Sequence, residues 1–255
     1  MKKYSNSELP ENLGSCWLIY GEPGIGKTYS FGTLPDPILA IITEPRDPRR
    51  TLNYPEAKGK KIDFVEFETF NEYMDMLDEL YQKYEEGTKP YKSICLDSLS
   101  FLQSKFKMDF EDDRFIDAIQ EKKRSNLLID KFRIEKADWG GLGSAMKRIT
   151  AVLNKFSKQG VQVVATATLT ENPSWNRDLT AAPAFQGEFA QVLNGYFDFI
   201  GLVTASGDTG NPYPPVISFV SPEQDFVAKS CSNTLNEKGG KGILDFKKIL
   251  KLINS

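Results

Sequence analysis

The segment GEPGIGKT at residues 21–28 decides the fold class of this sequence. It matches the pattern G-x-x-x-x-G-K-[ST] and directly follows a short apolar run, CWLIY, at residues 16–20. A strand followed by such a turn is typical of a phosphate-binding loop, because glycines let successive backbone N–H groups point at phosphate oxygens. We expect a helix to begin at Lys27 and to add its positive N-terminal end to the loop. The alternative is a glycine-rich turn that binds no ligand.

This loop predicts ATP and Mg²⁺ as cofactors. The Lys27 side chain would reach the β- and γ-phosphates, and the Thr28 hydroxyl would bind the metal. The residues expected to hold the nucleotide are Gly21, Glu22, Pro23, Gly24, Ile25, Gly26, Lys27, Thr28 and Tyr29.

A second apolar run, SICLD at residues 93–97, ends in Asp97. A buried strand that ends in aspartate is typical of the other half of an ATPase site, where the carboxylate accepts from Mg²⁺-bound water. We expect this strand to lie beside the first strand, so that Asp97 and Thr28 together form the metal site. The alternative is that Asp97 or Ser98 caps a helix expected at residues 99–106.

Glu44 follows a third apolar run, ILAIIT, at residues 38–43. The carboxyl ends of parallel strands face the ligand crevice, so Glu44 is a candidate to orient and deprotonate the attacking water. No glutamate follows Asp97, where AAA-type ATPases place their base. The alternative is a solvated loop residue paired with Arg46.

Apolar runs alternate with helical patterns along the chain. The sequence therefore predicts an α/β fold with a mostly parallel central sheet, helices on both faces and antiparallel strands at the C-terminal edge. Three late strands are expected to be antiparallel, because their links are too short for helical crossovers. We interpret residues 1–255 as a single domain, with residues 103–136 as a candidate charged helical extension. The expected strands are residues 16–20, 38–43, 62–67, 93–97, 161–169, 197–205, 216–220 and 226–229, and the main expected helices are 71–84, 141–156 and 242–253.

Composition excludes several classes of protein. The chain has 32 basic and 35 acidic residues, so it is not a globally basic nucleic-acid binder, although a local basic strip stays open. The absence of histidine removes Ser-His-Asp and Cys-His catalysis and every His-ligated metal site. Three dispersed cysteines form no zinc spacing and no even-numbered disulfide framework. No apolar run approaches the ~20 residues of a membrane span and no signal peptide is evident, so we expect a cytoplasmic protein without a membrane partner.

An ordered set of motifs resembles the phage RecA-like ATPases, some of which act as single-strand annealing proteins in phage recombination. The set covers most of the chain, from about Trp17 to Leu250. It consists of GEPGIGKT, TEP after the second strand, SICLDSLS, DWGGLGSAMKRITAVL, VQVVATATLTEN, FQGEFAQVLNGYFDFIGLV and FVAKS. The resemblance implies a RecA-like fold, ATP hydrolysis, self-assembly into a ring or filament, and location in the host cytoplasm.

The same resemblance assigns roles to two residues. Glu44 matches the water-activating glutamate that follows the second strand. Lys229 matches the lysine of a K-x-R pair that reaches a neighbour's γ-phosphate in related rings and filaments. Cys231 stands at the arginine position of that pair, so a catalytic finger would depend on Lys229 alone. The alternative for Lys229 is an exposed strand lysine.

Two stretches are candidates for contact with single-stranded DNA. Residues 171–187 match the second DNA-binding loop of the family and are expected to be irregular, with Trp175 and Arg177 as the stacking and cationic side chains. The alternative is a packed surface loop anchored by Trp175. Residues 105–136 mix acidic and basic side chains whose charges partly cancel, which favours the alternative of a solvated charged helix. Their basic residues include Lys122, Lys123, Arg124, Lys131, Arg133 and Lys136.

Polar residues near the end of the strand expected at residues 161–169 also bear on mechanism. The strand at residues 161–169 leads to Thr166, Thr168 and Glu171, which either sense the γ-phosphate or cap the backbone.

The functional hypothesis is a self-assembling RecA-like ATPase that acts on single-stranded DNA in recombination or annealing, with a phage single-strand binding protein as a further candidate partner. The alternative is a nucleotide-gated assembly or adaptor module with weak hydrolysis and a protein partner. A small-molecule kinase would show an Arg-rich lid, which is not evident.

Overall fold

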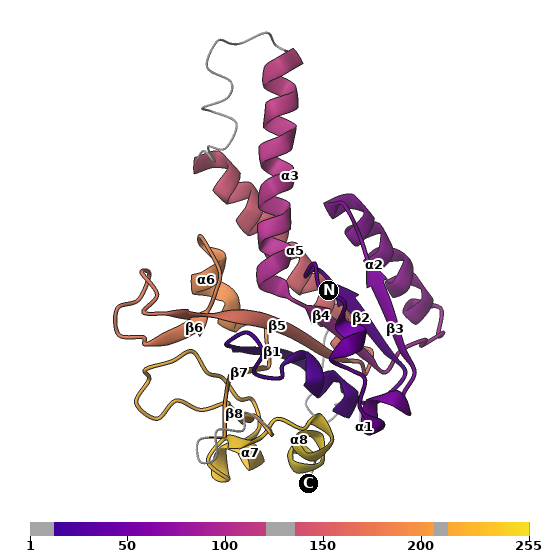
Figure 1. Ribbon diagram of the computed structural model, residues 1–255, viewed down its shortest axis with the longest axis vertical. Helices are drawn as coiled ribbons and strands as arrows, with labels where there is room; N and C mark the ends of the chain where they lie inside the picture. The colour runs from indigo at the N-terminus through magenta and orange to yellow at the C-terminus, as the bar shows by residue number, and fades with distance from the viewer. Residues whose placement is uncertain (1–12, 121–135, 207–213, 255) are drawn as a thin grey trace, which may run out of the picture.

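A computed structural model describes residues 13–120, 136–206 and 214–254 of the chain (Figure 1). Within these residues one sheet of nine strands has the order β3-β2-β4-β5-β1-β7-β8-β9, and β6 pairs with β5 beside this path. The strands are β1 (Cys16–Gly21), β2 (Ile38–Ile42), β3 (Ile62–Glu66), β4 (Ser93–Asp97), β5 (Gln162–Glu171), β6 (Ala181–Pro183), β7 (Phe199–Thr204), β8 (Val216–Ser218) and β9 (Lys241–Ile243). The α-helices are α1 (Pro55–Lys58), α2 (Phe70–Glu85), α3 (Leu99–Gln120), α5 (Lys136–Ser157), α6 (Phe189–Val192), α7 (Asn233–Glu237) and α8 (Phe246–Ile253). Short 3-10 helices are η2 (Thr28–Thr33), η3 (Pro48–Arg50) and η4 (Leu193–Gly195).

The predicted fold class is confirmed. Strand β1 pairs in parallel with β5 and β7, and β2 pairs in parallel with β3 and β4. The last strands, β8 and β9, are antiparallel to their neighbours at the C-terminal edge. All five strands β1, β2, β4, β5 and β7 therefore end at one edge, which receives the loops of the candidate site.

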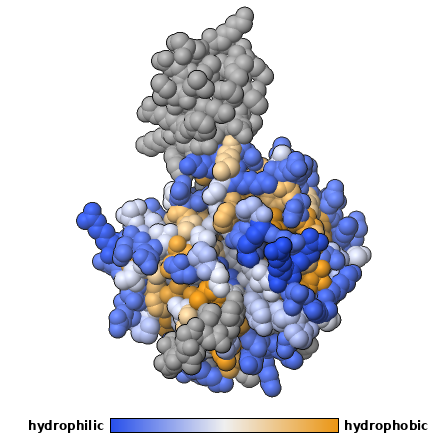
Figure 2. Space-filling view, viewed as in Figure 1, coloured by the Kyte–Doolittle hydropathy of each residue, from blue (hydrophilic) through white to orange (hydrophobic). Residues whose placement is uncertain are grey.

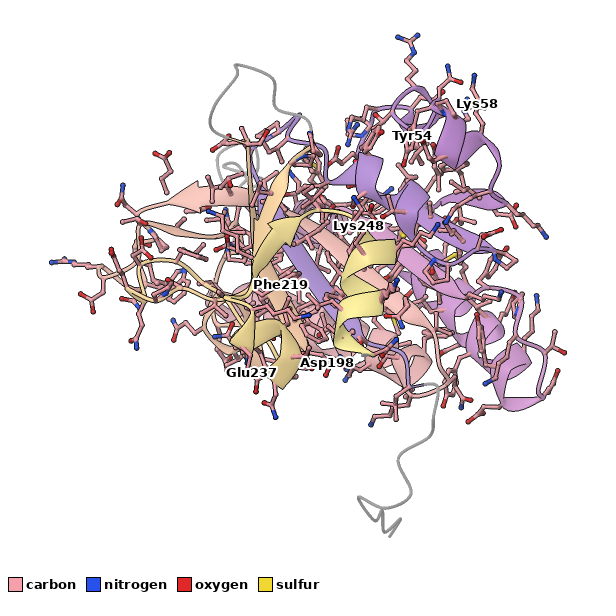
Figure 3. The ribbon with its side chains drawn as sticks, turned by 90° about the horizontal axis from the view of Figure 1, so that it is seen from below. Tyr54, Lys58, Asp198, Phe219, Glu237 and Lys248 are labelled. Atoms are coloured by element: carbon pink, nitrogen blue, oxygen red, sulfur yellow. The ribbon has the colours of Figure 1, made fainter. Side chains whose placement is uncertain are left out.

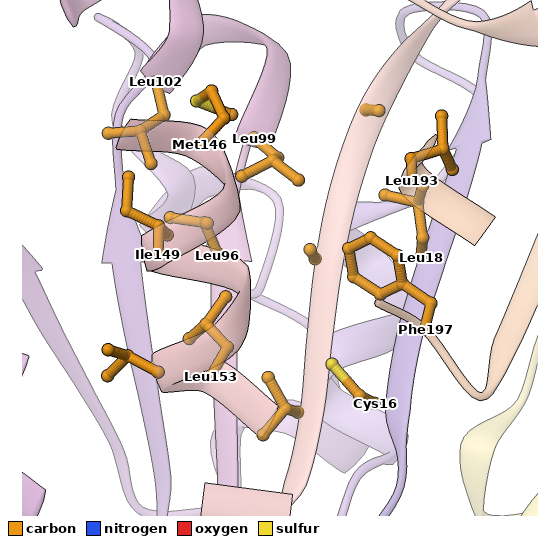
Figure 4. Packing of buried hydrophobic residues seen from close by; sticks show 14 of the residues in the cluster. Cys16, Leu18, Leu96, Leu99, Leu102, Met146, Ile149, Leu153, Leu193 and Phe197 are labelled. Atoms are coloured by element: carbon orange, nitrogen blue, oxygen red, sulfur yellow. The ribbon is translucent and has the colours of Figure 1, made fainter. Parts of the chain in front are cut away.

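Alternate residues of each central strand face opposite layers. On one face, Leu18 and Leu96 pack against the helices α2, α3, α5 and α6, as Figure 4 shows for Met146, Ile149 and Leu153 of α5. On the other face, Trp17 packs against η2, α7 and α8. Continuous burial of both faces explains why these strands are apolar throughout, and each large apolar side chain so buried contributes about 1.5–3 kcal/mol.

Aromatic contacts fix the second layer. The ring of Trp17 stacks on Phe199 at 3.9 Å and meets Phe219 and Phe246 edge-on at 5.6 Å. Phe246 is the first residue of α8, so its contact with Trp17 holds this helix against the centre of the sheet. Figure 3 views this layer from below, with α8 lying across the strands and carrying Lys248.

Three local expectations were wrong. No regular helix begins at Lys27, because the loop continues into the short 3-10 helix η2. The strand at residues 199–204 is parallel to β1, because the chain returns through β6, α6 and η4, which together make the crossover. Residues 226–229 form only isolated bridges, Phe226 to Ala181 and Lys229 to Ile200.

The segment expected to be an irregular loop at residues 171–187 is partly a hairpin. Strand β5 continues to Glu171, and β6 returns antiparallel to it, with Leu169 opposite Pro183. Helix α3 is also much longer than the predicted helix at residues 99–106. Its first turns pack on the sheet, its later turns extend beyond the sheet as the start of α5 does, and it covers the first part of residues 103–136 (Figure 1).

Surface composition is mixed. Hydrophilic side chains cover most of the face in Figure 2, with apolar patches between them. Among the described residues, the large apolar side chains that stay exposed are Leu13, Phe101, Met108 and Ile243. None of the helices in these residues combines the length and apolar character needed to cross a bilayer.

Candidate nucleotide and metal site

The loop after β1 has a backbone shape that requires glycine. Gly24 and Gly26 have φ angles of 79° and 101°, which side chains with a Cβ rarely adopt. Gly21 is required for a different reason: a Cβ at this position would lie 2.5 Å from the carbonyl oxygen of Val203 on β7, so no side chain fits there. Glu22, Pro23 and Gly24 are exposed at the tip. The loop therefore presents accessible backbone at the carboxyl edge of β1.

Lys27 is buried beneath this loop and donates to the loop's own carbonyl oxygens. Its Nζ lies 2.7 Å from the oxygen of Gly21 and 2.9 Å from that of Glu22. Burial lowers the pKa of Lys27, and the charges of Asp97 and Glu44 oppose this shift. A phosphate would offer the ammonium an anionic acceptor, which makes a stronger hydrogen bond than a neutral carbonyl. Lys27 is thus placed to exchange these carbonyls for a phosphate.

Tyr29 is held by the protein itself. Its ring stacks on Tyr54 at 3.9 Å, and the Tyr54 hydroxyl donates to the Tyr29 carbonyl oxygen at 2.7 Å. These contacts fix the start of η2 directly behind the loop. Contact of Ile25 or Tyr29 with a nucleotide stays a prediction.

Thr28 and Asp97 meet at the metal position that the sequence predicts. The Thr28 hydroxyl donates to Oδ2 of Asp97 at 2.7 Å. The predicted strand order was wrong, however, because β5 lies between β4 and β1. Thr166 on this intervening strand donates to Oδ1 of Asp97 at 2.6 Å. Asp97 therefore reaches Thr28 across one strand, and its second oxygen is held by that strand.

Ser98, rather than Asp97, caps the N-terminus of α3. The backbone N–H of Phe101 donates to Oγ of Ser98 at 3.3 Å, whereas the carboxylate of Asp97 faces Thr28 and Thr166. Burial raises the pKa of Asp97, and the hydrogen bond from Thr166 opposes this shift. A hydroxyl and a carboxylate are the oxygen ligands that Mg²⁺ prefers, so these residues fit that ion. The described residues contain no cluster of three acidic, Cys or His side chains, so the remaining ligands would be phosphate oxygens and water.

Glu44 lies at the same edge because β2 is the direct neighbour of β4. The N–H of Thr43 donates to the carbonyl oxygen of Asp97 at 2.8 Å, which locks the two strand ends together. The side chain of Glu44 is only 13% exposed, and its Oε2 lies 2.5 Å from Nε of Arg46. The pairing with Arg46 that we considered as the alternative is thus present, at the position required for a base.

The sequence indicated Arg46 only as a partner of Glu44, and its contacts with Thr28 and Asp97 were not predicted. Its Nη2 donates to Oγ1 of Thr28 at 2.7 Å and lies 3.4 Å from Oδ2 of Asp97. Burial alone would lower the pKa of Arg46, but the hydrogen bond with Glu44 and the charges of Glu44 and Asp97 raise it. Within the basic run at residues 46–50, no sequence signal indicates that Arg46, rather than Arg49 or Arg50, reaches Thr28 and Asp97.

The comparison with protein families agrees with this geometry. A family model described as an AAA domain matches residues 14–240. The chain belongs to this AAA domain family. Comparison with curated proteins finds no match. As an AAA domain, the chain is a nucleotide-binding protein of the P-loop ATPase class, and the family as a whole implies ATP and Mg²⁺. Membership does not extend to the narrower assignment as a phage RecA-like ATPase.

Lys229 of this AAA domain lies away from the nucleotide edge. Its Nζ donates to the carbonyl oxygens of Asn194 at 2.8 Å and Phe197 at 2.6 Å. Both carbonyls precede β7, at the amino edge of the sheet, where the N–H of Asp198 donates to the Cys16 carbonyl oxygen. In this arrangement Lys229 closes a turn of its own chain. Its role as a finger toward a neighbour stays a prediction without support from these contacts.

The candidate DNA residues of the AAA domain lie in the turn between β5 and β6. Trp175 is half-buried and packs against the larger apolar cluster, whereas Arg177 is exposed. Trp175 therefore anchors the turn, as the structural alternative proposed, and Arg177 remains accessible. The basic residues Lys122, Lys123, Arg124, Lys131 and Arg133 lie outside the described residues, and the side chain of Lys136 does so as well.

Hydrogen bonds that the sequence did not predict connect the β5–β6 hairpin and the residues after it to α3. The Gln103 amide donates to the carbonyl oxygen of Gln186 at 3.1 Å and accepts from the Gln186 N–H at 2.9 Å. The N–H of Thr168 also donates to Oγ of Ser100 at 3.2 Å. A cavity of about 530 Å³ opens beside these contacts, between α3 and the hairpin. The hairpin, α3 and the Asp97 strand are thus mechanically connected.

Proposed function

We propose that this AAA domain is a Mg²⁺-dependent ATPase of the RecA-like type that acts on single-stranded DNA. The convergence of Lys27, Thr28, Glu44 and Asp97 from three separate segments at one sheet edge carries the hydrolytic part of this proposal. Each side chain has the chemistry that phosphoryl transfer to water requires. We also propose that the chain is one domain, because the described strands join one sheet with an apolar cluster on either face.

The chain's own residues divide the work. The exposed backbone of the loop and the Lys27 ammonium would bind the β- and γ-phosphates and stabilise the charge that develops in transfer. Thr28 and Asp97 would hold Mg²⁺, which supplies neutralisation of phosphate charge when it is bound. Glu44 would orient a water and accept its proton as the new P–O bond forms and the bond to the leaving diphosphate breaks.

The ion pair with Arg46 occupies Oε2 of Glu44 and leaves Oε1 to face a water. Release of Arg46 would make both oxygens of Glu44 available, so slow hydrolysis is expected unless a ligand displaces Arg46. This observation also favours a second candidate function, a nucleotide-gated adaptor in which binding rather than turnover matters. The inward contacts of Lys229 favour the same candidate.

The proposed DNA function depends on β5. This strand touches the metal carboxylate through Thr166 and continues into the hairpin that carries Arg177. A strand shared by both sites is a direct route by which DNA could influence the nucleotide. The overall charge of −3 means that DNA contacts must be local. Self-assembly into a ring or filament, a single-strand binding protein as partner and a place in phage recombination rest on the sequence resemblance.

The experiment is ATP hydrolysis with and without single-stranded DNA, at low and moderate salt, with Lys27→Ala as the blank. We expect salt-sensitive stimulation by DNA that disappears in the blank. Binding of ATP without any response to DNA, and without salt-dependent retention of DNA, would support the adaptor. Absence of ATP binding by the wild-type protein would refute both.

A further inference from the structure

The guanidinium of Arg46 lies at the centre of the candidate site. Its Nη2 is 2.7 Å from Oγ1 of Thr28 and 3.4 Å from Oδ2 of Asp97, and its Nε is 2.5 Å from Oε2 of Glu44. One cationic group therefore contacts both predicted metal ligands and the predicted base. No other arginine among the described residues is shown in contact with any of these three oxygens.

We propose that Arg46 is an internal counter-ion that fills the metal position in the nucleotide-free protein and must be displaced before Mg²⁺ can bind there. This inference rests on the proposed function, because it assumes that Thr28 and Asp97 are the metal ligands. Arg46 acts through Glu44, Thr28 and Asp97 and is therefore a positioning residue.

Electrostatics explains why such a counter-ion is needed. The side chain of Asp97 is 3% exposed and that of Glu44 is 13% exposed, so two carboxylates with little access to water lie at one strand edge. An unpaired buried carboxylate is costly, and a positive group between the two reduces this cost. Arg46 supplies that group from within the chain.

The same geometry lets Arg46 leave. Its side chain is 48% exposed, and its other terminal nitrogen, Nη1, makes a long contact of 3.3 Å with Oγ1 of Thr51. Rotation of the side chain toward solvent would exchange its contacts with the site for contacts with water and require no change in the sheet. Departure of Arg46 would free Glu44 and both metal ligands in one step, which couples arrival of the metal to release of the base.

The first test uses Mg²⁺ alone, without nucleotide, and measures the thermal midpoint of unfolding. The variants are Arg46→Gln and the matched control Arg49→Gln, whose guanidinium pairs with Asp47 on the surface at 2.8 Å. We expect millimolar Mg²⁺ to stabilise Arg46→Gln and to have little effect on wild type or Arg49→Gln. Mg²⁺ stabilises a native state by mass action only where the state has a vacant site for it. Equal responses in all three proteins would overturn the proposal.

The second test measures the Mg²⁺ concentration that half-saturates binding of a fluorescent ADP. In Arg46→Gln we expect this concentration to fall about tenfold, the effect of no longer breaking one charge-assisted hydrogen-bond set. Arg46→Lys keeps the charge but cannot bridge three oxygens, so in this variant the half-saturating Mg²⁺ concentration should fall less than in Arg46→Gln. This conservative variant also decides the matter if Arg46→Gln does not fold.

Two outcomes separate the ideas. If ADP affinity at saturating Mg²⁺ drops while the half-saturating Mg²⁺ concentration is unchanged or higher, Arg46 contacts the nucleotide instead, and the counter-ion role is wrong. If the wild-type protein binds no nucleotide, the proposed function fails. The Mg²⁺-only thermal comparison still decides whether Arg46 blocks a cation site.

Discussion

The Thr166 hydroxyl on β5 donates to Oδ1 of Asp97 on β4 at 2.6 Å, while Thr28 donates to Oδ2 at 2.7 Å. Two hydroxyls from different segments thus hold both oxygens of one buried carboxylate. Thr166 is itself completely buried, so it fixes the orientation of Asp97 from within the sheet. The strand that separates β4 from β1 therefore contributes a side chain to the proposed metal site.

Replacement of Thr166 by valine should destabilise the protein and weaken the metal site. Valine has the same shape but leaves Oδ1 of Asp97 without a donor in a buried position, which costs roughly 1–3 kcal/mol. Urea unfolding of the nucleotide-free protein measures this loss. The control is Thr170→Val, further along the same strand, which should change stability by about 0.5 kcal/mol or less. Similar effects of the two variants would show that the Thr166 contact has no special weight.

Replacement of Asp97 by asparagine should remove metal binding and make the stability of the variant rise, relative to the wild type, as pH increases. Burial raises the folded-state pKa of Asp97 above its usual value, so the folded state binds more protons than the unfolded state between these two pKa values. Stability of the wild type therefore falls as pH rises through that window. Asparagine does not titrate, so the variant's advantage should grow as pH rises, with a slope of up to about 1.4 kcal/mol per pH unit inside the window.

The measurement is the free energy of unfolding in urea at pH 5 and pH 8. Asp178→Asn, at an exposed position in the turn between β5 and β6, gives the surface baseline. A stability difference between Asp97→Asn and wild type that shrinks on going from pH 5 to pH 8 would contradict the direction of the pKa shift.

The parts of the site that follow strand ends could be predicted from the sequence. Apolar runs locate the strands, and the carboxyl ends of parallel strands share one edge, so Lys27, Glu44 and Asp97 could be assigned to one place without knowing the strand order. The order itself could not be predicted, because adjacency depends on which strands the crossovers bring together. For that reason Thr166 was one of several candidate polar residues, and its contact with Asp97 emerged only from the structure.

Contacts made by loop side chains could not be predicted from the sequence for a different reason. Arg46 lies in a basic run where three arginines look alike, and only the packing of β2 against β4 selects one of them. Residues 226–229 look like a short apolar strand, but β8 pairs with β7 at residues 202–204, so on that side of β7 only Ile200 pairs with this segment, through Lys229. Lys229 consequently sits on a bridge near the amino edge rather than at the end of a strand.

Replacement of Glu44 by glutamine should reduce ATP hydrolysis by about 10²–10⁴-fold while leaving ATP binding intact. Glutamine keeps the size of the side chain but cannot accept the proton of the attacking water. Single-turnover hydrolysis and equilibrium binding of a fluorescent ATP analogue separate the two effects. Glu66→Gln is the matched control, since Glu66 ends β3 at the same edge of the sheet and is exposed. Hydrolysis by Glu44→Gln at the rate of that control would assign the base elsewhere.

Replacement of Arg177 by glutamine should weaken retention of single-stranded DNA without affecting the fold. Arg177 is exposed in the turn, and loss of one phosphate contact lowers the slope of log affinity against log salt by about 0.7 for a single strand. The measurement is fluorescence anisotropy of a labelled oligonucleotide over a range of salt concentrations. Arg148→Gln, at an exposed position on α5, is the matched control for loss of one positive charge.

Trp175 calls for a different substitution, because its ring packs against the apolar cluster and removal would disturb the turn. Trp175→Phe keeps an aromatic anchor, so it should preserve the thermal midpoint and the effect of Arg177 on DNA. If Arg177→Gln and Arg148→Gln lower the salt slope equally, binding depends on total charge and the turn is not a DNA site. If only Arg177→Gln lowers it and Trp175→Phe does not, then the ring acts as an anchor and the cation makes the contact. A loss of affinity in Trp175→Phe at an unchanged thermal midpoint would instead place the indole against a base.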